Sequence, residues 1–166
     1  EVHAGRVPMD RLRAIAPAID ALLADVPQGV SDQPPLAYEP DAYTDVYRQM
    51  DARGGLHLFV VLHAGEQVAA VSEATWYGDA SQAANQQFTG VARAFRGRGV
   101  GLAIKSRMLQ LVRDKVPDAR DVFTNNAVDN TPMLRINARL GFQGVRQSAV
   151  FQLRRDALAR QLGAIG

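Results

Sequence analysis

Residues 96–101 combine glycines with arginines in a pattern that suits the binding of an anion. The sequence is Arg-Gly-Arg-Gly-Val-Gly, and the surrounding apolar patterns predict a strand before it and a helix after it. The first turn of a helix carries unpaired N–H groups and a partial positive charge, both of which stabilise a phosphate. Glycine lets the backbone approach the anion, and Arg96 and Arg98 add fork-shaped cationic donors. A plain strand-to-helix turn with two solvated arginines is an equal interpretation of the segment alone.

The spacing Arg-x-x-Gly-x-Gly differs from that of two familiar nucleotide-binding loops. A P-loop is excluded because no Gly-Lys-Ser/Thr follows. The dinucleotide pattern Gly-x-Gly-x-x-Gly is excluded because Leu102 and Ala103 follow Gly101, and no acidic residue stands where the ribose would need one. Neither of these loop types is therefore predicted.

A carboxylate in the middle of an expected strand is a candidate general base. Glu73 lies within residues 68–77, on the same strand face as Val71 and Thr75. A carboxylate at a central strand position is unusual, and it could remove a proton from a substrate. An equal alternative is a side chain that points to solvent or pairs with an arginine.

Other polar and aromatic side chains could surround a substrate. His57 and His63 flank an apolar strand and are interpreted as structural. Asp79, in an expected loop, could select a cationic substrate. Three tyrosines could line an acceptor cleft, although helix packing explains the last two equally well: Tyr38, Tyr43 and Tyr47.

Apolar periodicity predicts the elements that position these residues. The expected helices cover 9–26, kinked or split at Pro17, then 41–52, about 100–116, and 131–141, the last with Thr131 as its cap and Pro132 behind it. The expected strands cover 56–62 and 68–77 as a hairpin, then 86–94, 121–124 and 145–153, while 27–40 form a loop. This order is typical of an α/β or α+β domain with a mixed sheet.

Length and composition predict one globular domain over residues 1–166. The chain has 166 residues, 47% of them hydrophobic, and its 19 basic and 17 acidic residues leave a net charge of +2, which predicts neither a nucleic-acid nor a membrane partner. Cysteine is absent, so disulfides and sulfur-ligated metals are excluded. No apolar run approaches the ~20 residues of a membrane span, and we expect a cytoplasmic protein. Because the first residue is Glu1, we also expect a trimmed chain or a piece of a longer one.

Residues 88–105 resemble the acetyl-CoA-binding strand, loop and helix of the GNAT superfamily of acetyltransferases. The family pattern Gln/Arg-x-x-Gly-x-Gly/Ala is matched by Arg96, Gly99 and Gly101. Residues 130–142 are similar to the family's second cofactor segment, with its leading asparagine and closing Gly-Phe. Residues 124–142 look more specifically like an actinobacterial subgroup, some of whose members carry two such domains in tandem.

The resemblance implies a splayed, mixed, mostly antiparallel sheet flanked by helices, which holds the pantetheine arm of acetyl-CoA between two strands. It implies direct acetyl transfer to a primary amine in a ternary complex, with acetyl-CoA as co-substrate and no metal. The N–H near Val91 would stabilise the oxyanion of the thioester, and N–H groups from Arg98 to Leu102 would hold the pyrophosphate. The implied cofactor contacts are Val91, Arg93, Arg96, Gly97, Arg98, Gly99, Val100, Gly101, Asn126, Asn130 and Asn137.

One position departs from the family pattern. Many members have a tyrosine that donates a proton to the leaving thiolate, and Asn137 stands there in this chain. Asn137 shares a helix face with Met133 and Leu140, so it is expected to point inward and to bond either the CoA sulfur and pantetheine or nearby backbone. An amide is no proton source near neutral pH, so the proton would come from water or the substrate. Glu73 and Asn137 are the residues assigned to catalysis.

The predicted function is acetylation of a small-molecule primary amine. Two alternatives stay open. The missing tyrosine would suit a non-catalytic CoA-binding or dimerisation domain, and the acceptor could instead be a protein N-terminus or lysine. A homodimer or a second GNAT domain is a further possible partner.

Overall fold

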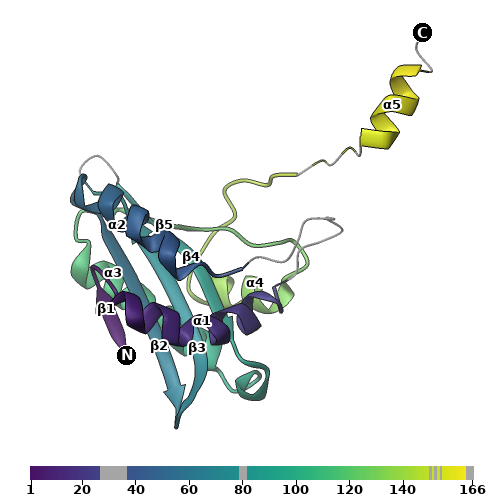
Figure 1. The fold of residues 1–166 in the computed structure, drawn as a ribbon. Coiled ribbons are helices and arrows are strands. Elements are labelled where there is room, and N and C mark those ends of the chain that lie inside the picture. Colours follow the sequence, from purple (N-terminus) through teal and green to yellow (C-terminus); the bar gives the residue numbers. More distant parts are fainter. Residues whose placement is uncertain (27–36, 79–81, 150, 152, 154, 164–166) are drawn as a thin grey trace.

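A computed structural model describes residues 1–26, 37–78, 82–149, 151, 153 and 155–163. These residues form five strands and five α-helices, together with two short 3₁₀ turns (Figure 1). The strands are β1 (Val2–Ala4), β2 (Leu56–Ala64), β3 (Gln67–Trp76), β4 (Ala83–Val91) and β5 (Asp121–Thr124). The helices are α1 (Met9–Leu23), α2 (Tyr43–Asp51), α3 (Val100–Lys115), α4 (Thr131–Arg139) and α5 (Arg155–Gly163), and the 3₁₀ turns are η1 (Pro40–Ala42) and η2 (Arg93–Phe95).

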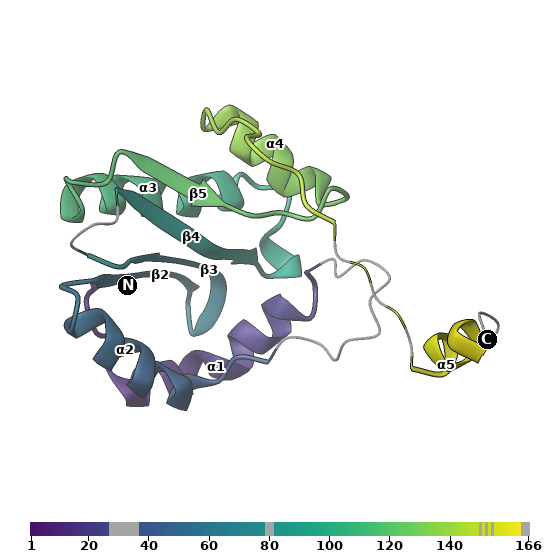
Figure 2. The same cartoon turned by 90° about the horizontal axis from the view of Figure 1, so that it is seen from above.

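The strands form one sheet in the order β1-β2-β3-β4-β5. Each neighbouring pair is antiparallel except β4 and β5, which run parallel. Helices α1 and α2 cover one face and α3 covers the other (Figure 2). The prediction of a mixed, mostly antiparallel sheet flanked by helices is therefore confirmed.

Alternation along β2 explains why the sheet is buried on both faces. Phe59 and Val61 pack with the core of α1 and α2, whereas Leu58 and Val60 pack with α3. A strand covered on both faces reads as a continuous apolar run, which is the pattern that the sequence has here.

The sheet opens between β4 and β5. The two strands pair only from Ala83 opposite Asp121 to Gln86 opposite Thr124. Beyond Gln86, the remaining part of β4 has no β5 partner in the ladder and continues to Val91 beside β3 alone. This places an unpaired stretch of backbone next to the glycine-rich segment.

Several boundaries differ from the predictions. Helix α1 is not split, because Pro17 lies in a continuous helix whose apolar face is buried. Strand β1 was not predicted, and β4 begins three residues before the expected start and ends at Val91. The cap of α4 is Asn130, whose Oδ1 accepts from the Met133 N–H at 3.3 Å, so the assignment of Thr131 as the cap was wrong.

The predicted strand 145–153 was also wrong for the residues that the structure describes there. They have no regular structure, and Val145 and Phe151 are 78% and 93% exposed. Alternation predicts a strand only where a neighbouring strand supplies hydrogen bonds, and none pairs with this part. Helix α5 follows it, away from the sheet in Figure 1, and was not expected. The predicted loop lies mostly outside the described residues, as does Asp79.

Candidate active site

The glycine-rich segment leads into the N-terminus of α3. Gly97 and Gly99 have φ angles of 72° and 80°, a left-handed conformation that favours glycine, and Gly99 is the N-cap of the helix. The Ala103 N–H donates to the Gly99 carbonyl at 3.0 Å, which is the first bond of the helix. The N–H groups before it have no partner within the helix, so they are available to an anion.

Gly101 lets three elements approach one another. A Cβ built on Gly101 would lie 2.9 Å from Cδ1 of Ile136 on α4 and 3.5 Å from Cγ2 of Val91 on β4. The space that a side chain would fill therefore lies between the N-terminus of α3, the end of β4 and the middle of α4. The predicted cofactor loop is thus next to the opening of the sheet.

Val91 directs its peptide groups into this opening. The Ala92 N–H donates to the Ala69 carbonyl at 2.9 Å across the β3–β4 ladder. Since the peptide groups of successive residues alternate in direction along a strand, Val91 must present its N–H and C=O away from β3. Its carbonyl accepts from Nε of Arg96 at 2.8 Å, which agrees with that direction.

Arg93 and Arg96, both expected at the cofactor, bind Asp25 just beyond the end of α1. Nε of Arg93 lies 3.0 Å from each carboxylate oxygen, and Nη2 of Arg96 lies 2.7 Å from Oδ2. The hydrogen bond from Arg93 is the main cause that holds the pKa of Asp25 below its ordinary value. Arg98 is exposed as well, and among the described residues it pairs with no carboxylate, unlike Arg93 and Arg96.

The asparagines of the second segment lie on and before α4. Asn137 is 7% exposed, which confirms the prediction that it points inward. Its Nδ2 donates to Oδ1 of Asn126 at 2.6 Å, and its own Oδ1 is buried with no partner among the described residues. Asn130 serves as the cap of α4. The amide of Asn137 therefore offers a buried acceptor to a ligand.

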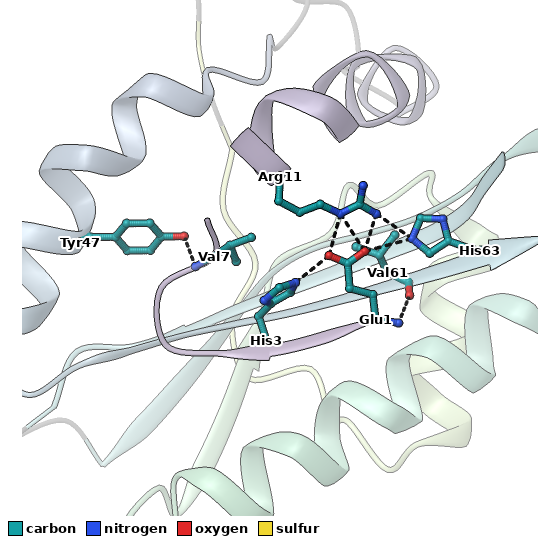
Figure 3. A network of polar contacts seen from close by, with 7 residues as sticks. All are labelled: Glu1, His3, Val7, Arg11, Tyr47, Val61 and His63. Carbon is teal, nitrogen blue, oxygen red and sulfur yellow. Dashed lines mark hydrogen bonds and ion pairs between the residues drawn. The ribbon is translucent and has the colours of Figure 1, made fainter. Parts of the chain in front are cut away.

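On the other face of the sheet, Glu73 belongs to a buried hydrogen-bond network. Its Oε1 accepts from the Tyr43 hydroxyl at 2.6 Å and lies 2.9 Å from Nε2 of His57. The Tyr47 hydroxyl lies 3.0 Å from Nδ1 of His57 and accepts from the Val7 N–H at 3.1 Å (Figure 3 draws this last bond). The alternative interpretation, in which Glu73 points to solvent or pairs with an arginine, is therefore wrong.

The Val7 N–H fixes the direction of this network. With that donor on the Tyr47 oxygen, the hydroxyl hydrogen points to Nδ1 of His57, so Nδ1 is an acceptor and Nε2 carries the hydrogen. His57 therefore donates to Glu73, as does Tyr43. Burial, and then the charge of Glu73, raise the pKa of Tyr43, which keeps that phenol protonated. The carboxylate thus accepts two bonds on Oε1 and retains Oε2 for a further donor.

The remaining aromatic and histidine candidates separate into two places. The Tyr38 ring lies 5.5 Å from that of Tyr43, which lies 5.2 Å from the His57 ring, so the tyrosines considered for an acceptor cleft lie together beside Glu73. His63 lies elsewhere, within hydrogen-bond distance of Glu1 and Arg11 near the chain's N-terminus (Figure 3). The structural interpretation of His63 fits this exposed cluster.

Lys105 is a buried cation that the sequence motifs do not identify. It is 1% exposed on α3, and its Nζ lies 5.0 Å from the centre of the Phe142 ring. Burial lowers its pKa to about 8. Lys105 is four residues after Gly101, one turn further along the same face of α3. This spacing is the sequence feature that could have indicated its position.

Among the residues that the structure describes, no helix is long and apolar enough to cross a membrane. Nor do three or more potential histidine, aspartate or glutamate ligands gather there into a candidate metal site.

Comparisons with known proteins identify the fold. No family model matches the sequence, and no curated protein matches it. Solved structures match over nearly the whole chain. A transcriptional regulator from Bacillus halodurans has a TM-score of 0.59 at 15% identity, with 92% of this chain and 100% of that chain covered. The structure of the aminoglycoside N-acetyltransferase AAC(6')-Iy in complex with CoA has a TM-score of 0.54 at 13% identity, with 93% of this chain and 99% of that chain covered. A ribosomal-protein-alanine N-acetyltransferase from Brucella melitensis has a TM-score of 0.58 at 12% identity, with 85% of this chain and 84% of that chain covered.

These likenesses show the fold, and it is the mixed, mostly antiparallel sheet flanked by helices that the resemblance of residues 88–105 and 130–142 to the GNAT superfamily implied. At these identities the likeness concerns the fold, so activity and substrate are argued from the site.

Proposed function

We propose that this protein transfers an acetyl group from acetyl-CoA to a primary amine by direct attack in a ternary complex. The observation that carries the proposal is the position of Val91. Its N–H points into the opening of the sheet, and the next turn of chain leads to the helix N-terminus at Gly99–Gly101. The donor for the oxyanion and the site for the diphosphate would therefore be neighbours along the chain from Val91 to Gly101.

The N-terminus of α3 would hold the pyrophosphate. Its free N–H groups and the helix dipole suit a diphosphate, and the exposed Arg98 adds positive charge beside them. Because Gly101 has no side chain, Ile136 of α4 and Val91 of β4 lie close to the first turn of α3. The pantetheine arm would run from there along the unpaired edge of β4, whose outward peptide groups are suited to an extended amide chain.

Glu73 would act as the general base. It lies opposite Phe88 of β4 in the ladder, three residues before Val91, so it is close to the place where the thioester would end. Its Oε1 is held by Tyr43 and His57, and Oε2 is left to accept the proton of the amine directly or through a water. Attack forms the C–N bond, Val91 N–H stabilises the oxyanion, and collapse breaks the C–S bond.

A small-molecule amine is the acceptor that we favour. The carboxylate of Glu73 beside three tyrosine rings is suited to a cationic ammonium group. The AAC(6')-Iy structures named for CoA and for a CoA–neamine bisubstrate analogue support a small acceptor on this fold. The non-catalytic alternative retains one specific observation in its favour, since Asn137 supplies no acid.

Calorimetry with acetyl-CoA, followed by a thiol-release assay against a panel of amines, tests the proposal. The wild-type chain should bind acetyl-CoA and release CoA with at least one amine. Gly101→Leu should raise Kd by about tenfold or more, because its side chain would collide with Ile136 and push α4 away from the first turn of α3, while Gly144→Leu, at a position with open space, should not. Binding without turnover on any amine would support the non-catalytic alternative, and a failure to bind any acyl-CoA would overturn the whole proposal.

A further inference from the structure

Lys105 is buried in a place where an ammonium group needs an explanation. The chain has two lysines, and the other, Lys115, is exposed at the end of the same helix. In the described part of the chain, no carboxylate bonds to the Lys105 ammonium, which lies over the Phe142 ring. A buried charge with so little compensation costs stability, and a leucine or methionine would fill the same position without that cost.

The surroundings of Lys105 are those of the opening in the sheet. Gly101, one turn earlier, faces Val91 and Ile136 across that opening. The ammonium of Lys105 lies over the ring of Phe142. Phe142 is held to α4 because its N–H donates to the Asn137 carbonyl at 3.0 Å. The side chain of Asn137 in turn leaves a buried oxygen without a partner. Lys105 thus contacts the ring of Phe142, whose backbone is bonded to that of Asn137. In the proposed function, the sulfur of bound CoA would lie on this side of α3, near the end of β4.

We propose that Lys105 is the acid that protonates the CoA thiolate as the acetyl group leaves. This inference rests on the proposed function. In the step, the C–S electron pair goes to sulfur, and the sulfur takes one proton from the Lys105 ammonium. Glu73 meanwhile holds the proton lost by the amine nitrogen. Glu73 then releases its proton to water and Lys105 takes one from water, so that the amine and thioester give an amide and a thiol with no net proton change.

The acidity of Lys105 suits this role. Burial lowers its pKa to about 8, close to the ~8.5 of an ordinary thiol. Transfer of a proton from this ammonium to a thiolate is therefore nearly balanced, whereas an exposed lysine at ~10.4 would hold its proton about a hundredfold more strongly. Burial is the only cause of the shift, so no titratable group of the strands or of α4 among the described residues contributes to it.

Lys105→Met and Lys105→Arg separate this role from a structural one. Methionine fills the site without charge, and arginine keeps the charge but does not give up its proton. Lys115→Met is the matched control on the exposed end of α3. We expect Lys105→Met to bind acetyl-CoA and to lose about a hundredfold in kcat. Lys105→Arg should also be slow, and Lys115→Met should equal the wild type.

A second measurement does not depend on turnover. The pKa of the thiol of bound CoA, followed by the ultraviolet absorbance of the thiolate, should lie about one unit or more lower in the wild type than in Lys105→Met, because the ammonium stabilises the thiolate. Lys105→Arg should retain most of that lowering. An unchanged thiol pKa and an unchanged kcat in Lys105→Met would overturn the role of Lys105 while leaving the proposed function intact. Failure of the wild type to bind CoA would instead overturn the proposed function.

Discussion

Arg96 joins the end of β4 to the end of α1, because its Nε donates to the Val91 carbonyl at 2.8 Å while its Nη2 lies 2.7 Å from Oδ2 of Asp25. Asp25 has a side chain that is 12% exposed, whereas that of Arg96 is 47% exposed. The arginine of the family motif thus holds the carbonyl of Val91, the same residue whose N–H would stabilise the oxyanion. Its effect on cofactor binding should depend on Asp25.

The first prediction is that Arg96→Ala and Asp25→Ala weaken acetyl-CoA binding through one shared interaction. Each should raise Kd by about tenfold, and the double variant should cost clearly less than the product of the two, since either single change already frees Val91. Titration calorimetry on the four proteins measures this coupling. Arg113→Ala, whose guanidinium pairs with Asp114 on the exposed side of α3, should leave Kd unchanged. Fully independent effects in the double variant would show that Asp25 does not act through Arg96.

The second prediction concerns the base. Glu73→Gln keeps the shape of the side chain but cannot accept a proton, so kcat should fall by about a hundredfold to a thousandfold while Kd for acetyl-CoA stays constant. Steady-state kinetics and calorimetry on the same preparation separate the two effects. Glu66→Gln, in the exposed turn between β2 and β3, is the control and should behave as the wild type. A Glu73→Gln enzyme with normal kcat would assign proton removal to another group.

The third prediction compares two tyrosines of one network. Tyr47→Phe leaves both the Val7 N–H and Nδ1 of His57 buried without a partner, so it should lower the free energy of unfolding by about 1–3 kcal/mol. Tyr43→Phe should cost less, because Oε1 of Glu73 still accepts from His57 and the Tyr43 side chain is more exposed. Urea unfolding of both variants measures the difference. Equal costs would contradict the assignment of Tyr47 as the group that fixes the His57 tautomer.

Local patterns predicted the glycine-rich turn and the helix that follows it, whereas they did not predict contacts between distant segments. The glycines at 97 and 99 and the helix start at Val100 follow from residues that are neighbours in sequence. Asp25, by contrast, lies 71 residues from Arg96, and nothing in its own surroundings indicates that partner. The hairpin of β2 and β3 sets Phe59 opposite Glu73, but a register shift at Leu62/His63 in that pairing is not visible in the sequence.

The site also shows where a pattern alone misleads. Apolar alternation in 145–153 predicted a strand, yet the described residues of this segment are exposed and pair with no strand. Conversely, helical spacing correctly predicted that Asn137 is buried, because the register of one helix suffices to define its inward face. Lys105 lies on such a face as well, but a lysine is ordinarily interpreted as solvated, and only its packing against Phe142 identifies it as buried.

The last prediction follows from that burial and concerns stability against pH. The pKa of Lys105 is lowered from 10.5 in an exposed lysine to about 8 in the fold. Between these values the unfolded chain binds more protons than the folded one, so the free energy of unfolding should rise as the pH is raised from 8 to 10.5. The gain should be at most about 3 kcal/mol, which is the limit set by the difference between the two pKa values. Lys105→Met should be more stable than the wild type near pH 7, and this advantage should shrink towards pH 10.5, whereas Lys115→Met should show neither effect.

Denaturant unfolding at a series of pH values measures the free energy of unfolding of the three proteins. Parallel curves for the wild type and Lys105→Met would show that Lys105 is not buried as a destabilising cation.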